Sequence, residues 1–208
     1  YEARGTVAEQ IYVEALLRDL DDELARRPAP AIGSVFIGGG TPSLFSGAAI
    51  ARLLDGLRAR TRFVDDAEVT LEANPGTAET ARFRAYIEAG VNRLSLGIQS
   101  FDAGHLQRLG RVHDADEARA AIGKARDAGC HNLNLDLMFG LPEAAPGDAL
   151  RDLEQAIAAA PEHVSWYQLT LEEGTAFAHQ PPPLPEHDAV CDDYDAGLEL
   201  LRDHGYEQ

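Results

Sequence analysis

Polar side chains stand where apolar segments of the sequence end, and their types suit a small charged ligand. Glu72 closes one such segment, Gln99 closes the next, and Asp136 lies inside a third. A carboxylate within an apolar strand is strongly unfavourable unless a partner meets it, so Asp136 has a buried partner or binds a ligand. Arg111 lies in a connection between two segments, where its guanidinium can clamp a carboxylate through two parallel hydrogen bonds.

Each of these residues also has a structural explanation, and the sequence leaves it open. Glu72 can cap a helix or pair with an arginine, and Gln99 can join neighbouring strands. Arg111 can pair with Asp114 at the surface. Polar residues at successive strand ends are harder to explain by structure alone, because ligands of parallel α/β folds bind at the carboxyl ends of the strands. We therefore expect a ligand site there.

Three consecutive glycines form the most unusual stretch of the chain, the sequence FIGGGTPS over residues 36–43. Glycine permits positive φ and lets a ligand approach the backbone closely. The stretch matches neither the dinucleotide fingerprint nor the phosphate-binding loop, and it lacks the lysine of the latter. A phosphate cradle is therefore the weaker interpretation, and carbonyl oxygens facing a cationic amine fit as well.

The elements that must position these residues alternate along the chain. Short segments rich in β-branched and aromatic residues predict buried strands, over 34–38, 68–73, 93–99, 132–138 and 163–171. Apolar periodicity predicts helices between them, over about 13–24, 46–57, 78–89, 116–128, 148–159 and 188–203. Asp114 and Glu117 form an N-cap signature. The alternation predicts a parallel α/β fold, as a barrel or a doubly wound sheet.

The composition narrows the class of protein. The 208 residues suffice for one domain, and the net charge of −17 argues against nucleic acid or an anionic membrane surface as a partner. Two distant cysteines, Cys130 and Cys191, make a disulfide framework or a cysteine metal site improbable. The cytoplasm is the expected compartment.

Six motifs in order resemble those of one known family: FIGGGTPS, LEANP, NRLSLGIQSFD, LQRLGRVHD, NLDLMFGLP and HVSWYQLTLEEGT. They resemble the radical S-adenosylmethionine (SAM) family of oxygen-independent coproporphyrinogen III oxidases and their relatives, and most of all the HemW-like branch of haem chaperones. The resemblance covers nearly the whole chain. It implies a partial (β/α)6 TIM-like barrel with SAM across the carboxyl ends of its strands.

The resemblance also implies which residues contact SAM. The glycine motif is expected at the methionine part, Arg111 suits a carboxylate, and Asp136 suits ribose hydroxyls. Thr170 is a weaker match, expected to meet adenine through its backbone. The full set is Gly39, Gly40, Thr41, Glu72, Gln99, Arg111, Asp136 and Thr170.

One departure from the family bears on activity. Its members carry Cys-x3-Cys-x2-Cys after the first barrel strand, and those thiolates bind a 4Fe–4S cluster. This motif is absent from residues 1–208. We therefore expect residues 1–208 to be a fragment of a radical SAM core that lacks the first strand, the cluster ligands and a C-terminal domain, and that is inactive alone.

Three functions remain open at this point. The resemblance favours a haem chaperone that binds SAM, a 4Fe–4S cluster and haem, and delivers haem to receiving proteins. The alternative is an oxygen-independent coproporphyrinogen III oxidase that forms protoporphyrinogen IX. An unrelated α/β barrel that binds a phosphorylated metabolite would leave the ordered motifs unexplained. The seven histidines are scattered without metal-ligand spacing, so none is nominated as a haem ligand.

Overall fold

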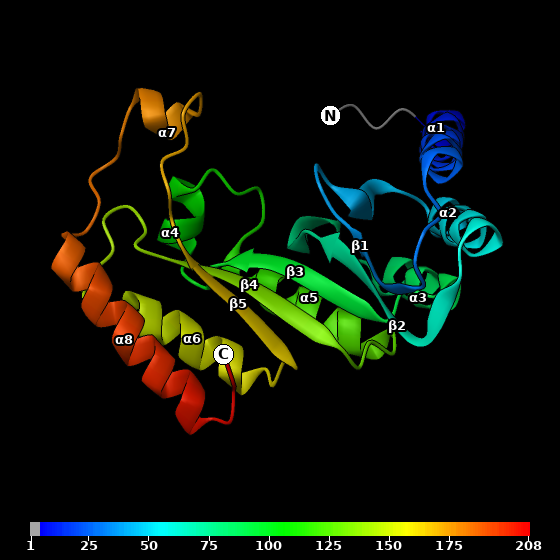
Figure 1. The fold of residues 1–208 in the computed structure, drawn as a ribbon. Helices are drawn as coiled ribbons and strands as arrows, with labels where there is room; N and C mark the ends of the chain where they lie inside the picture. Colours follow the sequence, from blue (N-terminus) through cyan, green and yellow to red (C-terminus); the bar gives the residue numbers. More distant parts are fainter. Residues whose placement is uncertain (1–4) are drawn as a thin grey trace.

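The computed structural model describes residues 5–208, in which five strands alternate with helices (Figure 1). The strands are β1 (Ile32–Ile37), β2 (Phe63–Ala73), β3 (Arg93–Gln99), β4 (Leu133–Phe139) and β5 (His163–Gln168). The α-helices are α1 (Gly5–Arg26), α2 (Gly47–Arg60), α3 (Thr80–Ala89), α4 (Ala103–Arg108), α5 (Ala115–Asp127), α6 (Asp148–Ala158), α7 (Ala176–His179) and α8 (His187–Asp203). Two short 3-10 helices, η1 (Pro42–Leu44) and η2 (Pro75–Thr77), follow β1 and β2.

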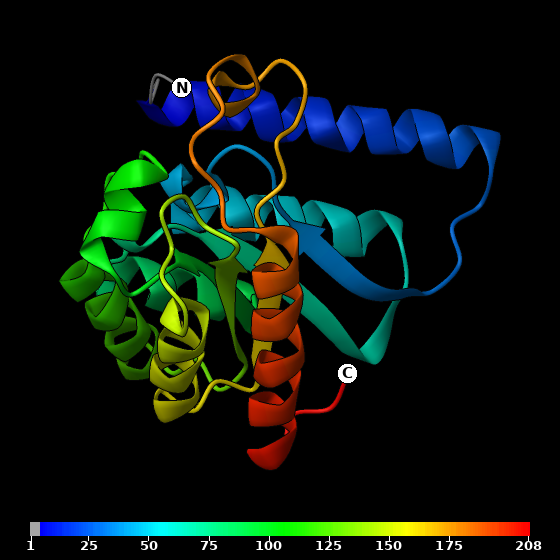
Figure 2. The same ribbon diagram turned by 90° about the vertical axis from the view of Figure 1, so that its left-hand side faces the viewer.

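The strands form one parallel sheet in chain order, β1-β2-β3-β4-β5. Each βα unit therefore places its strand beside the previous one, and all five carboxyl ends lie at one edge. The sheet curves as an open half-barrel, with α6 and α8 side by side near β5 and α2 next to α3 at the other end (Figures 1 and 2). The predicted parallel α/β fold and partial barrel are confirmed.

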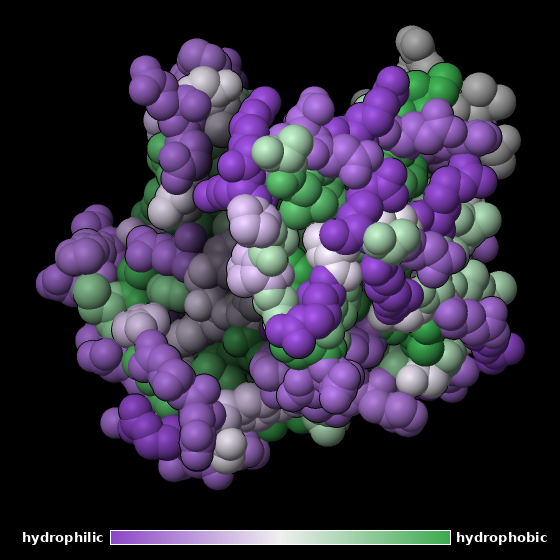
Figure 3. Space-filling model, turned by 45° about the vertical axis from the view of Figure 1, so that its right-hand side comes forward, coloured by the Kyte–Doolittle hydropathy of each residue, from purple (hydrophilic) through white to green (hydrophobic). Residues whose placement is uncertain are grey.

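The core lies between the central strands and the helices. Leu94, Leu96, Leu135 and Leu137 are fully buried, as expected for strands of a parallel sheet that is covered by helices. The surface shown in Figure 3 is mostly hydrophilic, and apolar side chains show through in separate patches. Within residues 5–208, no helix is both long and apolar enough to cross a membrane.

Local capping signals predicted where α2 and α5 begin. The Asp114 side chain accepts hydrogen bonds from the backbone of Asp116 and Glu117, and the Glu117 side chain closes the predicted capping box. Ser46 likewise caps α2 by accepting from the Ala49 N–H. The sequence missed α4 and α7, which are too short to show helical periodicity, and the first residues of β2, which are polar.

The contact between α8 and β5 yields a test of the packing. Gly197 of α8 lies against the Trp166 ring, so a methyl group there would collide with the indole. We expect Gly197→Ala to lower the free energy of unfolding by about 1–3 kcal/mol through overpacking, measured by urea denaturation.

Gly123 of α5 is the matched control, because a Cβ added there meets nothing within 4 Å. Gly123→Ala should raise the free energy of unfolding by about 0.5–1 kcal/mol, since alanine loses less backbone freedom in a helix. Equal effects of the two substitutions would contradict the described packing of α8.

Candidate functional site

A cavity of about 330 Å³ opens at the carboxyl ends of the strands. Its volume lies at the lower end of the range of about 300–1,000 Å³ that is typical of small-molecule sites. The cavity brings together most of the predicted site residues. The residues that line it are Gly40, Thr41, Pro42, Glu72, Ala73, Asn74, Ser95, Gly97, Gln99, Arg111, Asp136 and Tyr167.

The glycine loop contacts Glu72, which lines this cavity. The Gly39 N–H donates a hydrogen bond to Glu72 Oε2 over 3.0 Å. Gly39 and Gly40 have φ of +80° and +51°, a conformation that glycine adopts without strain. A Cβ on Gly38 would approach the Glu72 carboxylate to 3.0 Å. The glycines are thus required for the close approach of this carboxylate to the loop.

Neutral donors from the neighbouring strands surround the carboxylate of Asp136. Ser95 Oγ donates to it from β3 at 3.0 Å, and Asn134 Nδ2 donates from β4 at 2.7 Å. Ser165 of β5 donates to Asn134 Oδ1. Burial raises the pKa of Asp136, the hydrogen bonds from Ser95 and Asn134 oppose that rise, and the charge of Glu72 adds to it.

The sequence prediction named Asp136 but missed the residues that meet it. Ser95 pairs with Asn134 across β3 and β4, and Asp136 pairs with Ser165 across β4 and β5. Residues 134 and 136 share a face because strand side chains alternate. That alternation was readable in the sequence, whereas the register that aligns the serines was not.

Gln99 ends β3 in a left-handed conformation, with φ of +68°, and its side chain is buried. Tyr167 of β5 donates its hydroxyl hydrogen to Gln99 Oε1 over 2.7 Å. Burial raises the pKa of Tyr167, and the charge of Asp136 acts in the same direction. A Cβ on Gly97 would come within 3.0 Å of Gln99 Nε2, so this glycine leaves room for the amide.

Arg111 lines the cavity from the connection between α4 and α5. The preceding Gly110 turns the chain with φ of +67°. His113 Nε2 lies 3.1 Å from the carbonyl oxygen of Ile98 and ties this connection to the end of β3. Asp114 accepts hydrogen bonds from the first turn of α5. This capping role explains the presence of an aspartate there without a surface ion pair to Arg111.

The remaining two predicted residues lie outside the lining of this cavity. Gly39 adjoins it through its bond to Glu72 and lines an apolar cavity of about 360 Å³ beside α1 and α2. Thr170 follows β5, is exposed, and donates to Glu172 Oε1 over 2.8 Å. A role for the Thr170 backbone stays a prediction.

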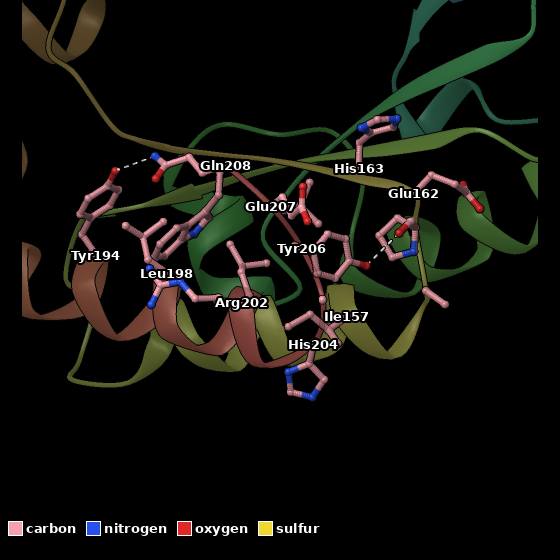
Figure 4. A pocket seen from close by; sticks show the side chains of 16 residues that line it. Ile157, Glu162, His163, Tyr194, Leu198, Arg202, His204, Tyr206, Glu207 and Gln208 are labelled. Atoms are coloured by element: carbon pink, nitrogen blue, oxygen red, sulfur yellow. Dashed lines mark hydrogen bonds between the residues drawn. The ribbon is translucent and has the colours of Figure 1, made fainter.

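A larger hollow, of about 1140 Å³, lies elsewhere, between β5, α8 and the last described residues (Figure 4). Tyr206 donates its hydroxyl hydrogen to the carbonyl oxygen of Pro161, and Gln208 donates to the Tyr194 hydroxyl. Figure 4 shows Tyr194, Tyr206 and Gln208 near β5 and α8. The lining of this hollow includes none of the predicted site residues, and its size alone does not make it the candidate site.

Comparison with known protein families decides the class. The sequence model of the radical SAM superfamily matches residues 8–156. The chain belongs to the radical SAM superfamily. This membership excludes the third function left open by the sequence, that of an unrelated α/β barrel that binds a phosphorylated metabolite.

An Escherichia coli protein called "Heme chaperone HemW" is 50% identical over 205 residues, which are 99% of this chain and 54% of that protein. The bovine "Radical S-adenosyl methionine domain-containing protein 1, mitochondrial" is 41% identical over 85% of this chain and 41% of its own length. The chain therefore spans about half the length of the curated relatives it matches. The structure of the E. coli coproporphyrinogen III oxidase HemN, described as a radical SAM enzyme, superposes with a TM-score of 0.79 and 27% identity, over 95% of this chain and 47% of that one.

The cavity fits the SAM that the superfamily implies. SAM presents an ammonium, a carboxylate and a sulfonium, and the lining offers two carboxylates, one guanidinium and a glycine-rich backbone. The described residues do not fit the cluster: no three His, Cys, Asp or Glu side chains within 5–208 converge on a metal position. The free cysteines are apart, Cys130 buried before β4 and Cys191 exposed on α8.

The raised pKa of Asp136 predicts a pH dependence of stability. Its pKa lies above the ordinary 3.8, mainly through burial, so the folded state holds this proton more tightly than the unfolded chain. The stabilising contribution of Asp136 to the folded state is present below pH 3.8 and is lost as the pH rises through the raised pKa. The stability of wild type relative to Asp136→Asn should therefore fall as the pH rises, measured by urea denaturation at successive pH values.

Asp102 provides a control of opposite sign. The backbone N–H of His105 lowers the pKa of Asp102 below 3.8, so its contribution is present above that pH and is lost as the pH falls. Wild type relative to Asp102→Asn should gain stability as the pH rises. If the stability of wild type relative to Asp136→Asn stayed constant or rose with pH, that result would contradict the burial of the Asp136 carboxylate.

Proposed function

We propose that the whole protein is a haem chaperone of the HemW type and that it binds SAM in the cavity at the strand ends. The observation that carries this proposal is the 50% identity to the E. coli haem chaperone over nearly the whole chain. The polar cavity supports it, because its charges complement SAM. Haem, a 4Fe–4S cluster and haem-receiving proteins belong to this proposal for the whole protein.

The residues of this chain bind and orient SAM in the proposal. Arg111 takes the carboxylate of the amino acid end, and Glu72, fixed by the Gly39 N–H, accepts from the ammonium. Asp136 keeps acceptor capacity for ribose hydroxyls beyond its bonds to Ser95 and Asn134. When bound, SAM supplies the activated carbon–sulfur bond on which the chemistry of the superfamily depends.

A second function has one observation in its favour. The structure of the coproporphyrinogen III oxidase HemN superposes on 95% of the chain. That oxidase shares 27% identity with the chain, against 50% for the haem chaperone of the same bacterium. The haem chaperone is therefore the better-supported function.

Arg111→Ala tests the binding site directly. The loss of a charge-assisted hydrogen bond to a carboxylate is worth about 1.5–3 kcal/mol, so we expect SAM to bind roughly 10- to 150-fold more weakly. The measurement is a calorimetric titration of the whole protein with SAM. Arg108→Ala is the matched control, because Arg108 pairs with Glu143 outside the cavity and should leave the affinity unchanged. Equal affinities of Arg111→Ala and wild type would refute the assignment of Arg111.

Assays with haem and with coproporphyrinogen III distinguish the haem chaperone from the oxidase. The chaperone proposal expects the whole protein, reconstituted with its cluster and SAM, to bind haem, seen as a shift of the haem absorbance band. It expects coproporphyrinogen III to remain unconverted under reducing conditions. Formation of protoporphyrinogen IX over many turnovers would overturn the chaperone proposal in favour of the oxidase.

A further inference from the structure

We infer that Asp152 of α6 is a positioning residue for the SAM site, acting through the end of β3. The inference rests on the proposed function, because it assigns a role toward the ligand of that site. Asp152 is outside the cavity lining and is only 3% exposed. It acts through the residues that follow Gln99.

The Asp152 carboxylate holds the chain directly after β3. Ser100 donates its hydroxyl hydrogen to Asp152 Oδ2 over 2.6 Å, and the Phe101 N–H donates to Asp152 Oδ1 over 2.7 Å. The Asp102 N–H donates in turn to Ser100 Oγ. Burial raises the pKa of Asp152, and the hydrogen bonds from Ser100 and Phe101 oppose the rise. One side chain thus binds two polar groups of a single turn.

This turn fixes the backbone of Gln99. Gln99 is one of few residues other than glycine with positive φ in residues 5–208, and such a conformation persists only when its surroundings enforce it. Ser100, the next residue, is fully buried and bound to Asp152. The Asp152 contact therefore helps to determine where the Gln99 amide enters the cavity.

The same helix reaches the connection that carries Arg111. His105 of α4 is buried, and its Nε2 lies 3.3 Å from Oδ2 of Asp148, one helical turn before Asp152. The Arg111 N–H donates to the carbonyl oxygen of Leu106 in α4. Two carboxylates of α6 thus contact the segments that carry Gln99 and Arg111, two of the side chains that line the cavity.

A purely structural role of the Asp152 contacts would be to join α6 to the end of β3. This structural role and the positioning role predict different effects on ligand binding. A purely structural role lowers stability and weakens all ligands of the cavity alike. A positioning role weakens most the ligand that uses the displaced side chains. SAM carries the carboxylate assigned to Arg111, whereas 5′-methylthioadenosine keeps the ribose and adenine but lacks the amino acid end.

The test compares Asp152→Asn and the milder Ser100→Ala with two controls on α6, in the whole protein. Glu154→Gln changes an exposed carboxylate, and Leu153→Ala opens a cavity in the core but removes none of the hydrogen bonds that Asp152 accepts. We expect Asp152→Asn to bind SAM about tenfold or more weakly while 5′-methylthioadenosine changes by less than about threefold, since small misplacement of binding groups has large effects. Leu153→Ala should weaken both ligands to the same extent or neither.

Amide hydrogen exchange of the ligand-free protein provides a second readout. Asp152→Asn and Ser100→Ala should speed exchange in residues 99–113 and leave β4 and β5 protected, while Glu154→Gln matches wild type. Equal loss of both ligands, or exchange that is unchanged in 99–113, would overturn the positioning role and leave the SAM site standing. Failure of the wild-type protein to bind SAM would remove the proposed function before any variant is compared.

Discussion

Asp136 carries a carboxylate into the interior of a parallel sheet, and the site around it follows from how that charge is met. Ser95 and Asn134 donate to it, and Ser165 orients Asn134, so three adjacent strands contribute to one hydrogen-bond network. A carboxylate without such partners would be too unfavourable to bury. The network requires β3, β4 and β5 to keep their register, because a shift by one residue would turn these side chains to the other face.

The charges of the cavity are mixed rather than uniformly acidic. Although the chain has a net charge of −17, Arg111 faces the same space as Glu72 and Asp136. Opposite charges fixed on separate elements select a ligand that itself carries both signs. The amino acid end of SAM has this character, which links the geometry of the site to membership of the radical SAM superfamily.

Sequence reasoning predicted what depends on local chemistry. The strands, the capping box at Asp114 and the polar residues at the strand ends all follow from neighbours in the chain. Ser95 and Ser165 escaped the predicted site because single polar residues within strands have no distinctive signal until the register aligns them. The contacts of Asp152 with Ser100 and Phe101 were equally hidden, since they join residues about fifty positions apart.

The order of the strands in the sheet is also their order in the chain. During synthesis on the ribosome, each new βα unit therefore finds its pairing partner already made. No strand has to wait for a later one to be inserted beside it, in contrast to folds whose central strand is synthesised last. Since chains emerge from the amino terminus at about 5–20 residues per second, such a sheet can grow strand by strand during translation.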